Sequence, residues 1–160
     1  MSGVASFNPA MELPEGVRIA LIATRFNADI VDRMLDAARS ALQRLDVVFD
    51  VFRVPGAWEL PLLAMNLAEQ NEHDALIAMG CVIRGDTRHY EHVADECARG
   101  LMQVQLDYGL PVANAVLAVE QRQDAVDRAG GVHGNKGEEA VLAALEMISL
   151  LYQGDWELEQ

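Results

Sequence analysis

Several features that define other classes of protein are scarce in this sequence of 160 residues. Its two cysteines, Cys81 and Cys97, cannot build a disulfide framework, which favours a reduced, intracellular protein. The N-terminus has no basic stretch followed by an apolar core, so the pattern predicts no signal peptide. The longest apolar runs, such as 75–83, are about half as long as a bilayer span. We therefore expect a soluble, cytoplasmic protein that does not enter a membrane.

Positive charge is also scarce. Lysine and arginine number 12 against 25 aspartates and glutamates, which gives a formal net charge of −13. Such a field repels polyanions and argues against nucleic-acid binding, although it leaves room for one local cationic pocket for a small anion. Apolar residues make up 51% of the chain and charged residues 23%, which excludes a mostly disordered protein.

The distribution of proline, glycine and periodic segments predicts one domain with two tails. Residues 1–16 show no sustained periodicity and contain two prolines and two glycines, so we expect an N-terminal arm that is loose in the isolated subunit. Residues 17–153 form the single domain, and residues 154–160 form an acidic C-terminal tail. The chain length agrees with one compact domain.

Within the domain, short apolar runs alternate with stretches of helical periodicity. Strands that alternate with helices pair in parallel through right-handed crossovers, which places helices on both faces of a sheet. The pattern predicts a three-layer α/β/α sandwich around a mainly parallel four-stranded sheet, similar to flavodoxin, with Asn27 as the N-cap of the first helix. The predicted strands are 18–26, 49–54, 75–83 and 112–119, and the predicted helices are 27–45, 58–69, 87–108, 123–129 and 137–152.

Ligands of open parallel sheets bind outside the carboxyl ends of the strands, and unusual residues gather at those ends here. After the most apolar strand, Gly85 permits a tight turn, and the backbone amides near Asp86 and Thr87 at the start of the predicted helix suit an anion. The alternative is a helix cap in which these side chains satisfy the same amides.

His89 falls in the first turn of that helix and can exchange protons near neutral pH. A lone helical histidine is more often structural or solvated, but its place beside an anion loop favours a catalytic role. His92 lies one turn further, and two histidines on one helix face can bind zinc. No second cluster of suitable spacing accompanies them, so we expect no metal.

Two other predicted strand ends offer an aromatic ring and polar groups. Phe26 can stack on a flat heterocycle, and the backbone of 57–59 with the Glu59 carboxylate can hydrogen-bond a pyrimidine or a sugar. The alternative is that Phe26 and Trp58 pack in the core or an interface and that Glu59 belongs to a first helical turn.

Arg128 and Lys136 place cations beside glycine-rich backbone, which suits a phosphate ester. Alternatively, Lys136 merely opens the last helix. The chain contains neither G-x-x-x-x-G-K-[ST] nor G-x-G-x-x-G, which argues against a nucleotide P-loop and against a dinucleotide site.

Four segments occur in an order that is recognisable as a whole: RFN at 25–27, VPGAWELP at 54–61, GCVIRGDTRHYEHV at 80–93 and GNKG at 134–137. Together they closely resemble the 6,7-dimethyl-8-ribityllumazine synthase family over residues 17–152, nearly the whole chain. The resemblance implies a transferase of riboflavin biosynthesis. It would condense 5-amino-6-(D-ribitylamino)uracil with 3,4-dihydroxy-2-butanone 4-phosphate and release phosphate and water, without a metal or a cofactor.

The resemblance also implies a role for each matching residue. His89 would transfer protons, Asp86, Thr87, Arg128 and Lys136 would bind the phosphate substrate, and Asn114 would contact the pyrimidine from a neighbouring subunit. Many family members have an aromatic residue in place of Asn114, and Asp86 would bring a negative charge close to the phosphate. The remaining pyrimidine-binding residues would be Phe26, Ala57, Trp58, Glu59, Cys81, Val82 and Ile83.

The resemblance further implies a homopentamer with active sites between subunits, in which the N-terminal arm extends the sheet of the next subunit. The short connection 129–137 is similar to that of members that assemble twelve pentamers into an icosahedral capsid. Riboflavin synthase is a further expected partner. Two alternatives stay open at this point: a flavin- or lumazine-binding protein without turnover, and a purely structural shell protein.

Overall fold

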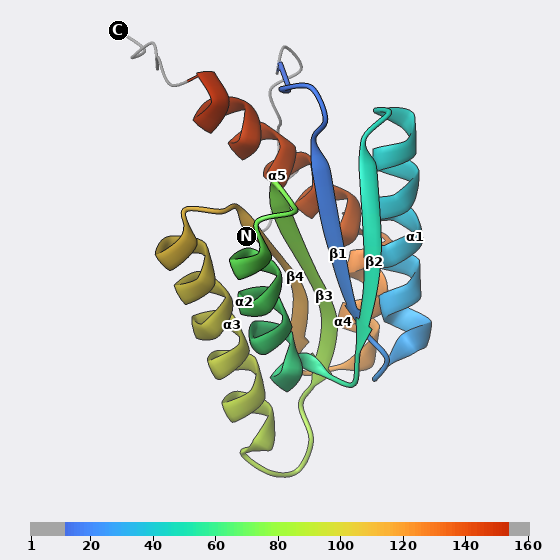
Figure 1. Cartoon of the computed structure of the whole chain (residues 1–160). Coiled ribbons are helices and arrows are strands. Elements are labelled where there is room, and N and C mark those ends of the chain that lie inside the picture. The colour runs from blue at the N-terminus through green and yellow to red at the C-terminus, as the bar shows by residue number, and fades with distance from the viewer. Residues whose placement is uncertain (1–11, 154–160) are drawn as a thin grey trace, which may run out of the picture.

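The computed structural model describes residues 12–153, and its centre is a parallel sheet (Figure 1). The first strand lies between the second and the third, so the chain reverses direction across the sheet, and right-handed crossovers then place helices on both faces. The four strands are β1 (Arg18–Thr24), β2 (Val48–Val54), β3 (Ala75–Ile83) and β4 (Val112–Val119), in the order β2-β1-β3-β4.

Helices cover both faces of this sheet (Figure 1). They are α1 (Ala28–Arg44), α2 (Leu60–Gln70), α3 (His89–Tyr108), α4 (Arg122–Arg128) and α5 (Lys136–Gln153), with a 3-10 turn η1 (Ala57–Glu59) before α2. Helices α2 and α3 pack on one face, and α1, α4 and α5 pack on the other. The predicted three-layer α/β/α sandwich is therefore confirmed. Among the described residues, no helix combines the length and the hydropathy needed to cross a bilayer.

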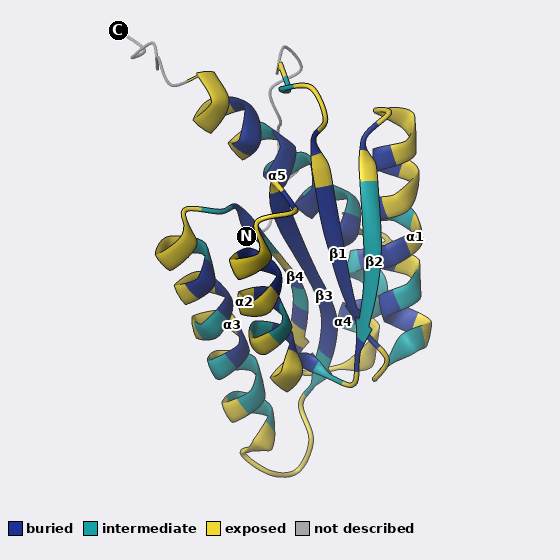
Figure 2. Cartoon of the chain, in the orientation of Figure 1, coloured by how far each residue is buried: buried dark blue, intermediate teal, exposed yellow. Residues whose placement is uncertain are grey.

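The sheet separates two apolar cores because successive side chains of a strand point to opposite faces. On β1, Leu21 packs with α1 and α5, whereas Ile22 packs with α2 and α3. The central strands β1 and β3 are almost completely buried, and the edge strand β2 is only half-buried along most of its length (Figure 2). This explains why the nearly continuous apolar runs in the sequence belong to the two central strands.

The structure differs from the sequence prediction mainly at the ends of elements. Strand β1 ends at Thr24, two residues before the predicted end, and α3 begins at His89, so Asp86 and Thr87 precede the helix. A small antiparallel hairpin, β5 (Ala129–Gly131) with β6 (Gly134–Asn135), was not predicted. Its strands have too few residues to show a period in the sequence.

Asn27 does precede α1, but its side chain does not cap the helix. The residue adopts the left-handed conformation with φ 57° and ψ 41°, and its Nδ2 donates to the carbonyl of Cys81 at 2.9 Å. The Asn27 carbonyl accepts hydrogen bonds from the amides of Ile30 and Val31. The prediction of a side-chain cap is wrong because the amide group bonds across the sheet edge instead.

Part of the expected N-terminal arm belongs to the described residues. Leu13 packs against the α1–α5 core, and the amide of Glu12 donates to Ser149 Oγ at 3.2 Å. The rest of the arm, 1–11, and the acidic tail, 154–160, lie outside the described residues.

Candidate active site

A cleft of 570 Å³ lies at the carboxyl ends of β1, β2 and β3, where the sheet topology predicts a ligand. Each strand end contributes one wall, and the start of α3 contributes another. The structure thus brings together nine of the residues singled out from the sequence. They are Phe26, Ala57, Trp58, Glu59, Cys81, Val82, Ile83, Thr87 and His89.

The aromatic wall of the cleft is Phe26, in the turn that follows β1. Its amide donates to the carbonyl of Pro55 at 3.0 Å, and its carbonyl accepts from Thr24 Oγ1 at 3.2 Å. The backbone of this turn is therefore fixed, while the Phe26 residue is 71% exposed. An aromatic ring that is held in place and left uncovered suits stacking on a flat ligand.

The second wall is the 3-10 turn η1 between β2 and α2. Gly56 is extended, and its carbonyl accepts from the amide of Glu59 at 3.2 Å, which closes the turn. Ala57 is buried and anchors η1, whereas Trp58 and Glu59 are exposed beside the cleft. Trp58 is 60% exposed, so it is not part of the core of this chain.

The third wall is the end of β3, which contributes mainly backbone. Burial raises the pKa of the Cys81 thiol to about 11, so the thiol is neutral at physiological pH and is a poor nucleophile. The amide of Arg84 donates to Val119 of β4. Because backbone groups of successive strand residues point to alternate sides, those of Cys81 and Ile83 point toward β1, away from β4.

The helix that follows the loop 84–88 begins two residues later than predicted. Because α3 begins at His89, the free amides of its first turn belong to His89 and the residues after it, and not to Asp86 or Thr87. The hydroxyl of Thr87 accepts from the His89 amide at 3.4 Å, and Asp86 is exposed outside the cleft lining. Both residues remain adjacent to the helix start, on an exposed loop.

Arg84 anchors this loop to its surroundings. Its guanidinium lies 3.1 Å from Glu91 Oε1 in α3 and 3.3 Å from Glu120 Oε1 after β4. It also lies over the ring of Tyr90, 6.0 Å from the centroid. Arg84 therefore joins the loop to α3 and to the segment after β4 through half-exposed ion pairs.

His89 is the first residue of α3, is exposed, and lines the cleft beside Tyr90 and Val93. Those two neighbours were not predicted, although helical spacing from His89 places Val93 on the same face. His92 is also exposed. Within residues 12–153, no three side chains of the metal-ligating types come together as a metal site.

Besides Asp86, three predicted site residues lie outside the cleft of their own chain. Asn114 on β4 is exposed, and its Oδ1 accepts from the amide of Val116 at 2.9 Å. Arg128 is half-buried at the end of α4, where its Nη1 donates to the carbonyl of Asp124 at 2.8 Å. Lys136 is exposed at the start of α5. A cleft within one subunit therefore lacks the two predicted cations, Arg128 and Lys136.

The residue that organises the loop before α5 is Asn135, which the sequence analysis missed. Its Oδ1 accepts from the amides of Gly137 and Glu138 at 2.9 and 3.3 Å, and its Nδ2 donates to the carbonyl of Arg33 at 3.3 Å. An asparagine just before a helical run is a capping signal that could have identified it.

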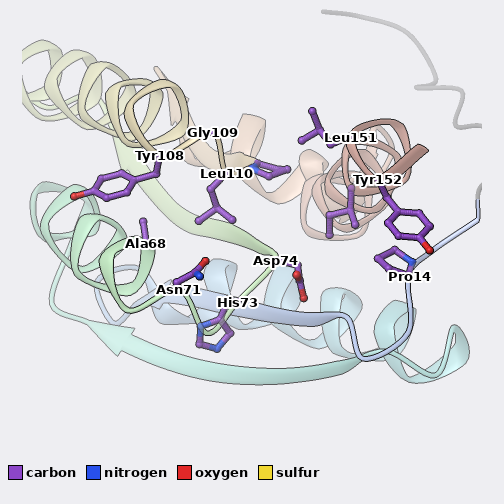
Figure 3. Close-up of a pocket in the computed structure, with 12 residues that line it drawn as sticks. Pro14, Ala68, Asn71, His73, Asp74, Tyr108, Gly109, Leu110, Leu151 and Tyr152 are labelled. Atoms are coloured by element: carbon purple, nitrogen blue, oxygen red, sulfur yellow. The ribbon is translucent and has the colours of Figure 1, made fainter. Parts of the chain in front are cut away.

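A second hollow of 330 Å³ lies at the opposite end of the sheet, between α3, α5 and the segment before β1 (Figure 3). The His73 ring is buried there, and its Nε2 is 2.8 Å from Asp50 Oδ2 on β2. Arg18 also bonds Asp50, and these two partners hold the pKa of the Asp50 carboxyl well below its usual range. The hollow lies at the amino ends of the strands, so this charged cluster is remote from the cleft.

The fold and the site define a class of protein: a flavodoxin-like α/β protein with a cleft at the carboxyl ends of its strands, the place where such sheets bind ligands. A family model described as 6,7-dimethyl-8-ribityllumazine synthase matches residues 16–152. The chain belongs to this family.

Named relatives agree with the family match. The 6,7-dimethyl-8-ribityllumazine synthase of Stenotrophomonas maltophilia (strain R551-3) is 60% identical over 146 residues, which cover 89% of this chain and 94% of the relative. The protein of the same name from Xanthomonas euvesicatoria pv. vesicatoria (strain 85-10) is 57% identical over 141 residues, 86% of this chain and 92% of the relative. The resemblance drawn from the four sequence segments is therefore confirmed.

Proposed function

We propose that this protein condenses 5-amino-6-(D-ribitylamino)uracil with 3,4-dihydroxy-2-butanone 4-phosphate to 6,7-dimethyl-8-ribityllumazine, phosphate and water. Membership of the synthase family supports the reaction. The observation that carries the assignment to a site is the single cleft at three strand ends, which gathers nine residues from segments far apart in the sequence. The free, buried cysteines agree with a cytoplasmic enzyme.

The pyrimidine substrate occupies the part of the cleft between Phe26 and the end of β3. The exposed Phe26 ring stacks on the heterocycle, and the backbone edge of Cys81, Val82 and Ile83 meets its donors and acceptors. The backbone of 57–59 and the Glu59 carboxylate hold the ribityl hydroxyls. We assign the heterocycle and the ribityl chain to different parts of the cleft because one wall is aromatic and two are polar.

The phosphate substrate binds beside the start of α3, where the first amides of the helix lack intrahelical partners. Thr87 and the Asp86 amide flank this point, and Arg128 and Lys136 supply positive charge. Arg128 and Lys136 are absent from the cleft of their own chain, and so is Asn114. We infer that Asn114 and Arg128 reach the cleft from a neighbouring subunit.

His89 acts as the proton-transfer group because it is exposed at the start of α3, next to the phosphate end of the cleft. The 5-amino group attacks the ketone carbonyl, and loss of water gives an imine. Removal of a proton from the neighbouring carbon then expels phosphate, and the second amine closes the ring with loss of water. The protein contributes mainly orientation and proton transfer.

A site shared between subunits requires an assembly of copies, and we propose the homopentamer that the sequence resemblance implies. The exposed apolar side chains on α2 and α3, such as Leu62, Met65 and Leu106, suit burial between copies. We propose further assembly into an icosahedral capsid because the connection between α4 and α5 is short. Riboflavin synthase is the proposed partner of that capsid.

The decisive experiment mixes purified protein with both substrates and follows lumazine absorbance and fluorescence against the uncatalysed background. Acceleration without added metal is expected. Riboflavin or lumazine binding without acceleration, in a sample that is fully assembled, would refute the synthase and leave a binding protein.

The shared site is tested by subunit complementation. The variants H89A and R128A, each inactive or slow alone, are unfolded, mixed and reassembled. Restored turnover in the mixture is expected because some sites then combine an intact His89 with an intact Arg128 from its neighbour. Absence of restoration in mixed oligomers, verified by mass, would place both residues in one subunit. Analytical ultracentrifugation of the wild type that shows only pentamers would refute the capsid.

A further inference from the structure

The end of β3 extends beyond its pairing with β1, so a buried backbone carbonyl there needs another hydrogen-bond donor. Strand β1 pairs with β3 only as far as Ala23 with Met79, while β3 continues along β4 to Ile83. Beyond Met79 the pairing stops, and the next β1-side amide, that of Phe26, donates to Pro55, so the Cys81 carbonyl has no strand amide to receive. Cys81 is buried, and an unsatisfied buried carbonyl is strongly unfavourable.

Asn27 occupies the place of the missing strand. Its side-chain Nδ2 donates to the Cys81 carbonyl at 2.9 Å, a normal length for this type of bond. The residue reaches it because the backbone turns through the left-handed conformation, which asparagine tolerates better than most residues. The turn after β1 is thereby joined to the end of β3.

This bond joins two of the three walls that the strand ends contribute to the cleft. Phe26 directly precedes Asn27 in the chain, and its own backbone bonds are to Pro55 and to Thr24, on the side of β1 and β2. Cys81 belongs to the backbone wall, and both residues line the cleft together with Asn27. The Asn27 side chain therefore sets the position of the aromatic wall relative to the backbone wall.

We propose that Asn27 is a positioning residue for the pyrimidine substrate, acting through the Cys81 carbonyl and the Phe26 turn. The proposal rests on the function proposed above and adds a residue to it. A flat ring that stacks on Phe26 and hydrogen-bonds to the end of β3 binds tightly only when the Phe26 ring and the β3 backbone are held at the correct distance and orientation. The Nδ2 donor, and not merely the volume of the side chain, is what the position requires.

Two substitutions distinguish the effect of the Nδ2 hydrogen bond from the effect of the left-handed backbone at position 27. Asn27→Gly removes the side chain but keeps the left-handed turn, which glycine adopts freely. Asn27→Asp keeps the shape but turns a carboxylate oxygen toward the Cys81 carbonyl. We expect KM for the pyrimidine to rise roughly tenfold in both variants, equivalent to about 1.4 kcal/mol, with the larger rise in the Asp variant. We expect kcat and KM for the phosphate substrate to stay within about twofold of wild type.

Asn71 offers a matched control. It is also a left-handed asparagine, with φ 54°, but it follows α2 at the opposite end of the sheet and lines the second hollow. Asn71→Gly and Asn71→Asp are expected to leave both KM values unchanged. Calorimetric titration with the pyrimidine alone checks that the rise in KM is a rise in Kd, and ultracentrifugation checks assembly.

The outcomes are distinct. Loss of pyrimidine affinity in both Asn27 variants, but in neither Asn71 variant, supports the proposal. Unchanged pyrimidine affinity in both Asn27 variants overturns it. Weaker binding in the Gly variant alone also overturns it, because shape would then matter and the donor would not, and so does an equal loss for both substrates. Failure of the wild-type protein to catalyse the reaction would instead refute the proposed function.

Discussion

Replacing Gly137 by alanine tests how tightly α5 is packed against α1. Gly137 is buried at the second position of α5, and a Cβ built there would lie 2.2 Å from the carbonyl oxygen of Met34 and 2.8 Å from its carbonyl carbon. Both atoms are backbone atoms of α1, so no side chain can rotate to relieve the contact. Ordinary contacts begin at 3.4 Å, so the two helices must separate by more than an ångström.

Two effects of the substitution oppose each other. Alanine is favoured over glycine in a helix by about 1 kcal/mol, partly because it restricts the unfolded chain. Overpacking of a filled core costs about 1–3 kcal/mol and occasionally more, and a clash between two backbones lies at the upper end of that range. We expect the free energy of unfolding to fall by about 2–3 kcal/mol, which lowers Tm by roughly 4–12 °C for a chain of this size.

The measurement is urea unfolding followed by circular dichroism, at one fixed protein concentration because assembly contributes to stability. Gly85→Ala is the control, since an added Cβ there meets nothing within 4 Å. We expect that variant to stay within about 0.5 kcal/mol of wild type. A Gly137→Ala protein as stable as wild type would refute the close approach of α1 and α5.

Three further predictions concern the cleft and the charged cluster at the other end of the sheet. His89→Ala should lower kcat by roughly 100-fold or more and leave the Kd of the pyrimidine unchanged; steady-state kinetics with an unchanged rate would remove His89 from the mechanism. Arg128→Ala should chiefly raise KM for the phosphate substrate, and a defect confined to the pyrimidine would contradict its assignment. Asp50 is ionised and bonded to Arg18 and His73 in the folded protein, with its pKa below the unfolded value. Its contribution to stability is thus present at neutral pH and is lost as pH falls below about 4. Asp50→Asn should therefore be less stable than wild type at pH 7, with a difference that shrinks in acid; a constant difference in denaturation experiments from pH 7 to pH 3 would refute this.

Much of the site could be predicted because parallel strands send their carboxyl ends to one edge. Phe26, Glu59 and His89 are separated by about thirty residues each, yet each lies at or after the end of a predicted strand, and the structure places all three in one cleft. The start of α3 was predicted two residues too early, at Thr87 instead of His89. The loop before it also carries the ion pairs of Arg84 with Glu91 and Glu120, which join separate elements. Such long-range pairs have no local sequence signal.

The architecture could be read from the order of apolar and amphipathic segments along the chain. Apolar runs such as 75–83 alternate with segments of helical spacing such as Ile30 to Leu42, and this alternation predicts a parallel sheet covered by helices on both faces. Tertiary structure alone decided the role of Asn27. Its position before a helical segment predicted a side-chain N-cap, but the carbonyl to which its side chain donates belongs to a residue 54 positions away, in another strand. A hydrogen bond forms with the nearest unsatisfied group in space, and proximity in space is settled only when the strands have paired.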